Sequence, residues 1–183
     1  IVLPANYLAS IIRALPNKKI QLTTDPTNNT CQIKCSHSKF NIHGSAADEF
    51  PLLPEISSET TFTLPQKDLK QIINHVKFAA AEDKNKPFLT GGLLTINNNS
   101  LKLVATDTYR LAYRKQKKDF SFTTQAIIPN KTLAELNKLL NNTSEQVEIT
   151  LTANQALFKF AGISIISRLI EGQFPDYQQV IPK

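Results

Sequence analysis

The sequence is poor in the residues that carry most enzyme and cofactor chemistry. Its 183 residues include no Met, no Trp, two Cys, three His and five Gly. With so little glycine, neither of the common glycine fingerprints of nucleotide-binding loops occurs. The His residues are scattered, and the acidic residues do not gather as a metal site requires. We therefore expect no enzyme active site, no metal and no cofactor.

Long apolar runs are also absent. No stretch approaches the ~20 residues that a membrane-spanning helix needs. Pro4, Asn6 and Arg13 interrupt the first apolar segment, which argues against a secretory signal. The chain is therefore expected to be soluble and cytoplasmic. Because it starts at Ile1 and contains no Met, we also expect it to be a fragment of a longer protein.

The two cysteines, Cys31 and Cys35, are too few for a disulfide framework. They lie four residues apart in a β-prone run, so both would point to one face of a strand. His37 and His43 follow, and a metal site is one interpretation of this cluster. Two reduced strand cysteines are the favoured interpretation, because the spacing is not a usual zinc spacing.

The charge is unevenly distributed along the chain. Residues 61–118 hold eleven Lys or Arg and four Asp or Glu, whereas the segments on either side are close to neutral. A local basic surplus suggests a polyanionic partner such as nucleic acid, and a solvated basic face is the alternative.

Three segments of the chain share one pattern. Residues 1–4, 62–65 and 127–129 are β-prone runs that end in Pro. Pro suits a first helical turn, because its missing N–H would be unpaired there. Apolar residues then recur at helical spacing and predict three amphipathic helices, with these buried faces: Leu8, Ile11, Ile12 and Leu15; Leu69, Ile72, Ile73 and Val76; Leu133, Leu136, Leu139 and Leu140.

Each predicted helix is followed by three runs of alternating apolar and polar residues, which predict half-buried antiparallel strands. These runs are residues 20–23, 31–35 and 40–42, then 92–96, 101–105 and 110–114, then 147–151, 156–160 and 163–169. The chain is therefore predicted to be an α+β protein of repeated β-α-β-β-β units.

The closing residues of the first and third units also match. An acidic residue precedes Phe50-Pro51 in one and Phe174-Pro175 in the other. A period of two units implies domains of two units each. Residues 57–183 would then be one complete domain, residues 1–56 the second half of a preceding domain, and residues 54–61 the linker.

The middle unit holds two candidate functional features. The side chains of Lys67, Lys70, Asn74 and Lys77 follow helical spacing opposite the apolar stripe. Such a row suits contact with phosphates without reading base sequence, or it is simply a solvated face. Asp107 lacks the second base or metal that catalysis needs, so we interpret it as a cap of the turn between two strands.

Two longer motifs point to a known family. Residues 104–112, Val-Ala-Thr-Asp-Thr-Tyr-Arg-Leu-Ala, resemble the Ala-Thr-Asp-x-x-Arg-Leu-Ala signature of the bacterial DNA sliding clamp, the beta subunit of DNA polymerase III. Residues 171–177 and 180–182 resemble the close of that clamp's middle domain, and residues 62–65 resemble its start.

The resemblance implies a ring. In this family, two three-domain subunits close head to tail around duplex DNA, with helices inside and antiparallel sheets outside. The implied function is that of a processivity factor without catalytic activity, which holds DNA weakly and independently of sequence. The chain would supply the second half of domain one and the whole middle domain.

The resemblance also suggests which residues face DNA. Five lysines are candidates, the first three from family position and the last two from helix geometry alone: Lys70, Lys86, Lys131, Lys67 and Lys77. Glu82 and Asp83 depart from the more basic or polar family pattern in the loop at 82–88, which weakens the DNA contact expected there.

A second implied function is docking of the replicative polymerase, the clamp loader and repair factors. In the family, a short Gln, Leu and Phe motif of the partner enters an apolar pocket. Thr108-Tyr109 stands where the family often has Gly-His, and Gln179 where it often has Arg. Core packing is the alternative role for the apolar members of the matching set, which comprises Leu89, Thr106, Thr108, Tyr109, Arg110, Leu111, Pro175, Gln179 and Val180.

Subunit contacts are the third expectation from the family. The second half of domain one meets domain three of the partner subunit in a homodimer, and the matching positions are Tyr7, Ile11, Leu15, Phe40 and Ile42. The alternative for the whole chain is a stand-alone adaptor that reuses the repeat, binds only proteins and encircles no DNA.

Overall fold

The computed structural model describes residues 1–50, 60–83 and 85–181. Most of the predicted linker 54–61, and Pro182 of the closing motif, lie outside the described residues. The chain divides into two compact units, Ile1–Glu55 and Ile56–Lys183. In the part of the chain that is described, no helix has the length and apolarity needed to cross a membrane.

The three predicted helices are confirmed as α1 (Ala5–Ala14), α2 (Gln66–Val76) and α3 (Asn130–Leu139). Each begins directly after its Pro, which is the N-cap. The placement of Pro inside the first turn was therefore wrong by one residue. The reason is that the Pro carbonyl still accepts the first helical hydrogen bond, as Pro4 O does from Leu8 N at 3.1 Å.

The first unit has one antiparallel sheet in the order β1-β2-β3, built from β1 (Gln21–Asp25), β2 (Thr30–Cys35) and β3 (Ser38–His43). Cys31, Ile33 and Ile42 are buried, and the apolar side of α1 packs against them. The strand predicted at residues 1–4 does not form. Val2 makes only an isolated antiparallel bridge to Ser45.

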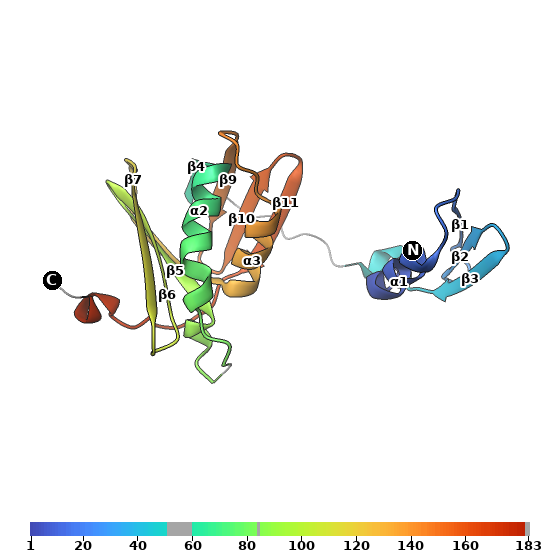
Figure 1. The fold of residues 1–183 in the computed structure, drawn as a ribbon, viewed down its shortest axis with the longest axis horizontal. Helices are drawn as coiled ribbons and strands as arrows, with labels where there is room; N and C mark the ends of the chain where they lie inside the picture. The colour runs from blue at the N-terminus through green and yellow to red at the C-terminus, as the bar shows by residue number, and fades with distance from the viewer. Residues whose placement is uncertain (51–59, 84, 182–183) are drawn as a thin grey trace. The chain divides into compact units, whose positions relative to one another are not determined.

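The second unit has two four-stranded antiparallel sheets (Figure 1). The order of the first is β7-β6-β5-β8, from β5 (Gly91–Asn97), β6 (Ser100–Thr106), β7 (Leu111–Lys117) and β8 (Thr124–Pro129). The order of the second is β11-β10-β9-β4, from β4 (Thr60–Pro65), β9 (Gln146–Leu151), β10 (Gln155–Phe160) and β11 (Ile163–Arg168).

The two repeats of this unit exchange their opening strands. β4 precedes α2 in the chain but pairs with β9, which follows α3. β8 precedes α3 but pairs with β5, which follows α2. Residues 1–50 hold a single repeat, so no second sheet is there to accept their opening segment. This explains why residues 1–4 form a bridge rather than a strand.

One apolar core joins α2, α3 and both sheets of the second unit. Ile72 and Ile73 of α2 and Leu136 of α3 are almost completely buried in it. The two helices are in contact and run side by side against the sheets (Figure 1). The remaining sides of α2 and α3 therefore form a helix layer that faces away from the core.

The face of β7-β6-β5-β8 turned away from α2 carries a separate apolar row. The residues of this row, which lie opposite one another across the four strands, are Ile127, Leu93, Val104 and Tyr113. The residues next to them in the sequence point to the opposite face of the sheet, toward the main core. The four residues of the row are not part of that core.

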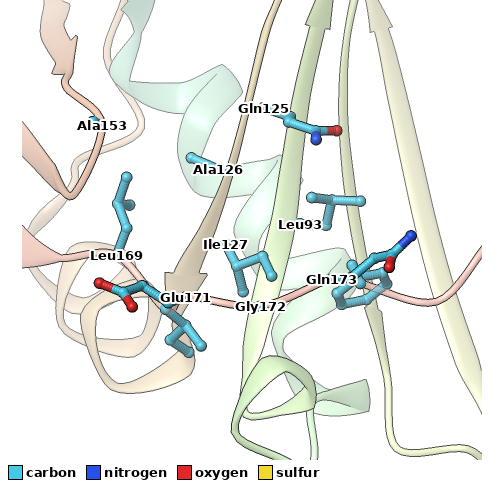
Figure 2. Close-up of a pocket in the computed structure, with 11 residues that line it drawn as sticks. Leu93, Gln125, Ala126, Ile127, Ala153, Leu169, Glu171, Gly172 and Gln173 are labelled. Carbon is cyan, nitrogen blue, oxygen red and sulfur yellow. The ribbon is translucent and has the colours of Figure 1, made fainter.

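The chain after β11 crosses this apolar row. Ile170 N donates to Ile127 O at 2.9 Å, and the Tyr177 ring lies 6.0 Å from the Tyr113 ring. A hollow of about 650 Å³ lies beside this crossing, and Leu93 and Ile127 are among the residues that line it (Figure 2). The crossing leads to η4 (Tyr177–Val180), a short 3-10 helix.

Candidate functional site

The turn between β6 and β7 is fixed by two side chains. The Thr106 hydroxyl donates to Arg110 O at 2.7 Å and accepts from Thr108 N at 3.2 Å. Asp107 Oδ1 accepts from Tyr109 N at 3.0 Å and from Arg110 N at 2.9 Å. The interpretation of Asp107 as a turn cap is confirmed.

Thr108 has a backbone conformation that L residues rarely adopt, with φ of 81°. The sequence has Thr at a position where the resembling family often has Gly. Tyr109 follows Thr108 in this turn and projects into solvent, with 97% of the residue exposed. An exposed aromatic residue on a fixed turn is suited to contact a partner.

An ion pair and a cation–π contact hold the Arg110 side chain in place beside Tyr109. Arg110 Nε donates to Asp107 Oδ2 at 3.0 Å, and its guanidinium lies 5.8 Å from the centre of the Phe78 ring. The hydrogen bond from the Arg110 backbone N–H is the largest of the effects that lower the pKa of Asp107 below its ordinary value of 3.8.

These residues line a cleft of about 580 Å³ in front of the turn. Four of the predicted pocket residues meet there: Leu89, Thr108, Tyr109 and Arg110. The other lining residues come from the end of α2, the following loop, the turn and α3: Lys77, Phe78, Ala80, Ala81, Glu82, Asp83, Lys86, Asp107 and Asn130.

Sequence reasoning missed Phe78 as part of this cleft. Its side chain is 58% exposed although it lies in η2 (Lys77–Ala79), between the buried residues Val76 and Ala79. The sequence signal for its exposure is its place in the helical spacing of α2. Phe78 lies outside the apolar stripe that Leu69, Ile72 and Val76 define, so it is an apolar residue on the polar side.

The other predicted pocket residues do not line the cleft. Thr106 is buried and bonded within the turn, and Leu111 is half-buried at the start of β7. Three more belong to the segment around η4, where all are exposed: Pro175, Gln179 and Val180. Gln179 Nε2 donates to Asp176 Oδ2 at 2.9 Å, so its amide is partly engaged.

The predicted lysine row of α2 divides into two kinds of residue. Lys67 is exposed, whereas Lys70 is half-buried and its Nζ donates to Leu140 O at 2.6 Å. The Asn137 amide, in the orientation that its neighbours favour, accepts from Lys77 Nζ at 3.0 Å. α3 packs along one side of the row, so Lys70 and Lys77 are half-buried and engaged while Lys67 stays exposed. Contact of this row with phosphates stays a prediction.

The other two predicted lysines, Lys86 and Lys131, are exposed. The carboxylates of the two helices are engaged: Asp68 Oδ2 accepts from Gln116 Nε2 at 2.8 Å, and Glu135 pairs with Lys138 at 2.8 Å. Glu135 also lies near enough to Lys131 for the lysine charge to lower the pKa of this carboxyl group. The helix layer therefore carries acidic as well as basic groups, which suits weak binding of phosphates.

The predicted subunit-contact residues also divide. Tyr7 is 68% exposed and Phe40 is 40% exposed. Ile11 and Leu15 pack against the small core of the first unit. Ile42 is only 7% exposed and its side chain packs in that core. Its part in a subunit contact stays a prediction, because the spacing of a strand cannot tell the face toward a partner from the face toward its own helix.

Cys31 and Cys35 are both buried on one face of β2. Cys35 Sγ lies 3.9 Å from Pro16 O. Within residues 1–50, 60–83 and 85–181, no group of three or more His, Cys, Asp or Glu lies close enough to hold a metal ion.

Comparison with known families covers nearly the whole chain. The family described as DNA polymerase III beta subunit, central domain, matches residues 63–176. The family described as the N-terminal domain of the same subunit matches residues 1–54.

Individual relatives agree with the family matches. The chain is 41% identical to the Beta sliding clamp of Staphylococcus epidermidis, over 100% of this chain and 48% of the relative. It is 40% identical to the Beta sliding clamp of Staphylococcus aureus, with the same coverage. The chain therefore spans about half the length of the relatives it matches.

Solved structures share the fold. The DNA polymerase sliding clamp from Bacillus subtilis matches with a TM-score of 0.86 and 33% identity, over 99% of this chain and 48% of that one. The DNA polymerase III subunit beta from Pseudomonas aeruginosa matches with a TM-score of 0.86 and 30% identity, over 99% and 50%. The predicted α+β clamp fold is confirmed.

Proposed function

The chain belongs to the DNA polymerase III beta subunit family, and from this membership we propose that it is part of a ring that encircles duplex DNA as a processivity factor. Residues 1–56 would supply the second half of the first clamp domain, and residues 57–183 the complete middle domain. The proposed role is non-catalytic, because the ring would retain the polymerase by topology rather than by chemistry. The proposed location is the cytoplasm, where a bacterial replication protein would meet its DNA.

The helix layer is the proposed DNA-facing side. Lys67 of α2 and Lys131 of α3 are exposed on this layer, and Lys86, exposed in the loop after α2 where it also lines the docking cleft, adds a third lysine available to phosphates. Lys70 and Lys77 lie on the same layer but are held by α3, so we assign them a mainly supporting part. Contacts from lysine to phosphate carry no sequence information and are compatible with sliding.

The cleft beside Tyr109 is the proposed docking site for partner peptides. One observation supports this docking site most directly. Leu89 comes from a different segment than Tyr109 and Arg110, yet all three line one cleft of about 580 Å³. Phe78, Leu89 and the Tyr109 ring offer apolar contacts in a lining that is otherwise mostly charged or polar, so a peptide would be held by both kinds of contact. The partners are the replicative polymerase, the clamp loader and repair factors, and Pro175, Gln179 and Val180 would extend the site.

In the proposed homodimer, residues 1–50 would take part in the contact between subunits. Tyr7 and Phe40 are its best-placed members, since their side chains already project from the first unit.

A titration of the isotope-labelled chain with a short synthetic peptide of Gln, Leu and Phe tests the docking site. We expect NMR shifts at residues 106–111 and near Leu89. Tyr109→Ala should weaken binding roughly tenfold, because a central aromatic contact is lost.

Tyr7→Ala is the matched control, because it removes another exposed tyrosine from the first unit. It should leave the peptide affinity unchanged. Equal losses for the two variants, or no shifts at saturating peptide, would count against the docking site.

A further inference from the structure

One sheet face carries positive charge that its own strands do not balance. This basic sheet face is the side of β7-β6-β5-β8 turned away from α2 and α3. Lys102 of β6 lies directly opposite Lys115 of β7, and Lys117 follows two residues later on the same face. The four strands of this sheet contain no Asp or Glu.

The other sheet of the same unit provides an internal comparison. Its outward-facing Lys159 lies opposite Glu148, with Nζ and Oε1 3.9 Å apart. Lys102 has Thr95 on one side and Lys115 on the other. Like charges directly opposite one another destabilise a sheet, so cross-strand pairing gives no reason for this arrangement.

The basic sheet face is accessible. Lys115 and Lys117 are exposed and Lys102 is half-buried, and among the described residues none of the three forms an ion pair. Lys115 and Lys117 also line an open hollow of about 340 Å³ with Asn99, Lys118 and Asp119, so three lysines face a single carboxylate there. Lys118 differs, because its Nζ donates to Thr63 O at 2.5 Å.

An aromatic pair borders these charges. Tyr113 is 40% exposed on the same strand and face as Lys115, and it packs against Tyr177. We propose that the basic sheet face binds an acidic protein segment. Carboxylates of the partner would lie over Lys102, Lys115 and Lys117, and an apolar side chain would lie against the tyrosine pair.

A protein partner fits this face better than a nucleic acid does. The lysines lie on an open pleated surface and not along a groove that follows a phosphate backbone. The helix layer, on the opposite side of the sheets, already offers lysines to DNA. The proposal therefore adds a second binding face to the one that the docking cleft provides.

The test measures binding of a fluorescent synthetic peptide of consecutive Glu residues ending in Phe. The triple variant Lys102→Gln/Lys115→Gln/Lys117→Gln should bind it roughly tenfold more weakly, because each exposed ion pair contributes up to a few-fold. The affinity of the unchanged chain should fall with added salt. The control Lys18→Gln/Lys19→Gln/Lys39→Gln removes the same charge from the first unit and should bind nearly as the unchanged chain does.

A second measurement separates binding from folding. Lys115→Gln relieves the repulsion between Lys102 and Lys115, so its thermal unfolding midpoint should equal or exceed that of the unchanged chain. Three results would overturn the proposal: no peptide binding at low salt, an equal loss in the control variant, or tighter binding of an oligo-dT strand that the triple variant abolishes.

Discussion

At the scale of the residue, Asp107 shapes the docking cleft through the turn that carries Tyr109. Its hydrogen bonds hold its pKa below the ordinary value of 3.8. A carboxyl group with a lowered folded-state pKa contributes stability above its unfolded-state pKa and loses it as the pH falls through the folded-state pKa. We expect the amide NMR signals of Tyr109 and Arg110 to titrate with a midpoint below the ordinary Asp pKa of 3.8.

Asp107→Asn is the informative variant, because the amide keeps a carbonyl acceptor but does not titrate. The shift should disappear from Tyr109 and Arg110 in this variant. Asp25 provides the internal control, since it accepts from Thr27 N at 2.9 Å and also has a lowered pKa. The Thr27 signal should titrate in both proteins; an unchanged Tyr109 titration in Asp107→Asn would contradict the assignment.

At the scale of the element, Gln66 anchors the start of α2 to the loop after α3. Its side chain is fully buried, donates to Glu145 Oε2 at 3.0 Å and accepts from Asn141 N at 2.9 Å. Gln66→Ala should lower the free energy of unfolding by about 2 kcal/mol, because two part-buried hydrogen bonds are lost and the buried Gln66 side chain leaves a cavity. Chemical denaturation measures this change.

Asn130 is the matched control for the element, because it opens α3 as Gln66 opens α2. Its buried Oδ1 has no hydrogen-bond partner among the described residues. Asn130→Ala should therefore cost less than half as much as Gln66→Ala. Similar costs at the two positions would show that the anchor contributes little.

At the scale of the whole molecule, the two sides of the second unit are expected to bind different partners. Replacing Lys67, Lys86 and Lys131 by Gln should weaken duplex DNA binding and reduce its salt dependence. Each lost phosphate contact lowers the slope of log affinity against log salt by about 0.9, so the total change is roughly 2–3. Fluorescence anisotropy at several salt concentrations gives this slope.

The sheet-side triple variant, Lys102→Gln/Lys115→Gln/Lys117→Gln, is the charge-matched control for DNA binding. It should leave the salt slope nearly unchanged. If both triple variants reduced the slope equally, DNA would respond to net charge alone, and the helix layer would lose its assigned role. A chain that binds peptides normally but shows no duplex binding would favour the adaptor interpretation.

Local patterns determined the elements of this protein. Helical spacing after Pro65 and alternation in β9 depend only on neighbouring residues, so the sequence was enough to place α2 and the strands. The motif at 104–112 likewise located Tyr109 and the capping carboxylate Asp107.

Contacts between distant segments were decided only by the tertiary structure. Strand spacing contains no information about which repeat a strand will pair with, so the exchange of β4 and β8 and the failure of residues 1–4 to form a strand could not be predicted. The burial of Lys70 against α3 and the place of Phe78 in the cleft likewise depend on segments that are distant in the sequence. Periodicity is a property of adjacent residues, whereas pairing and side-chain engagement depend on what the rest of the chain packs beside them.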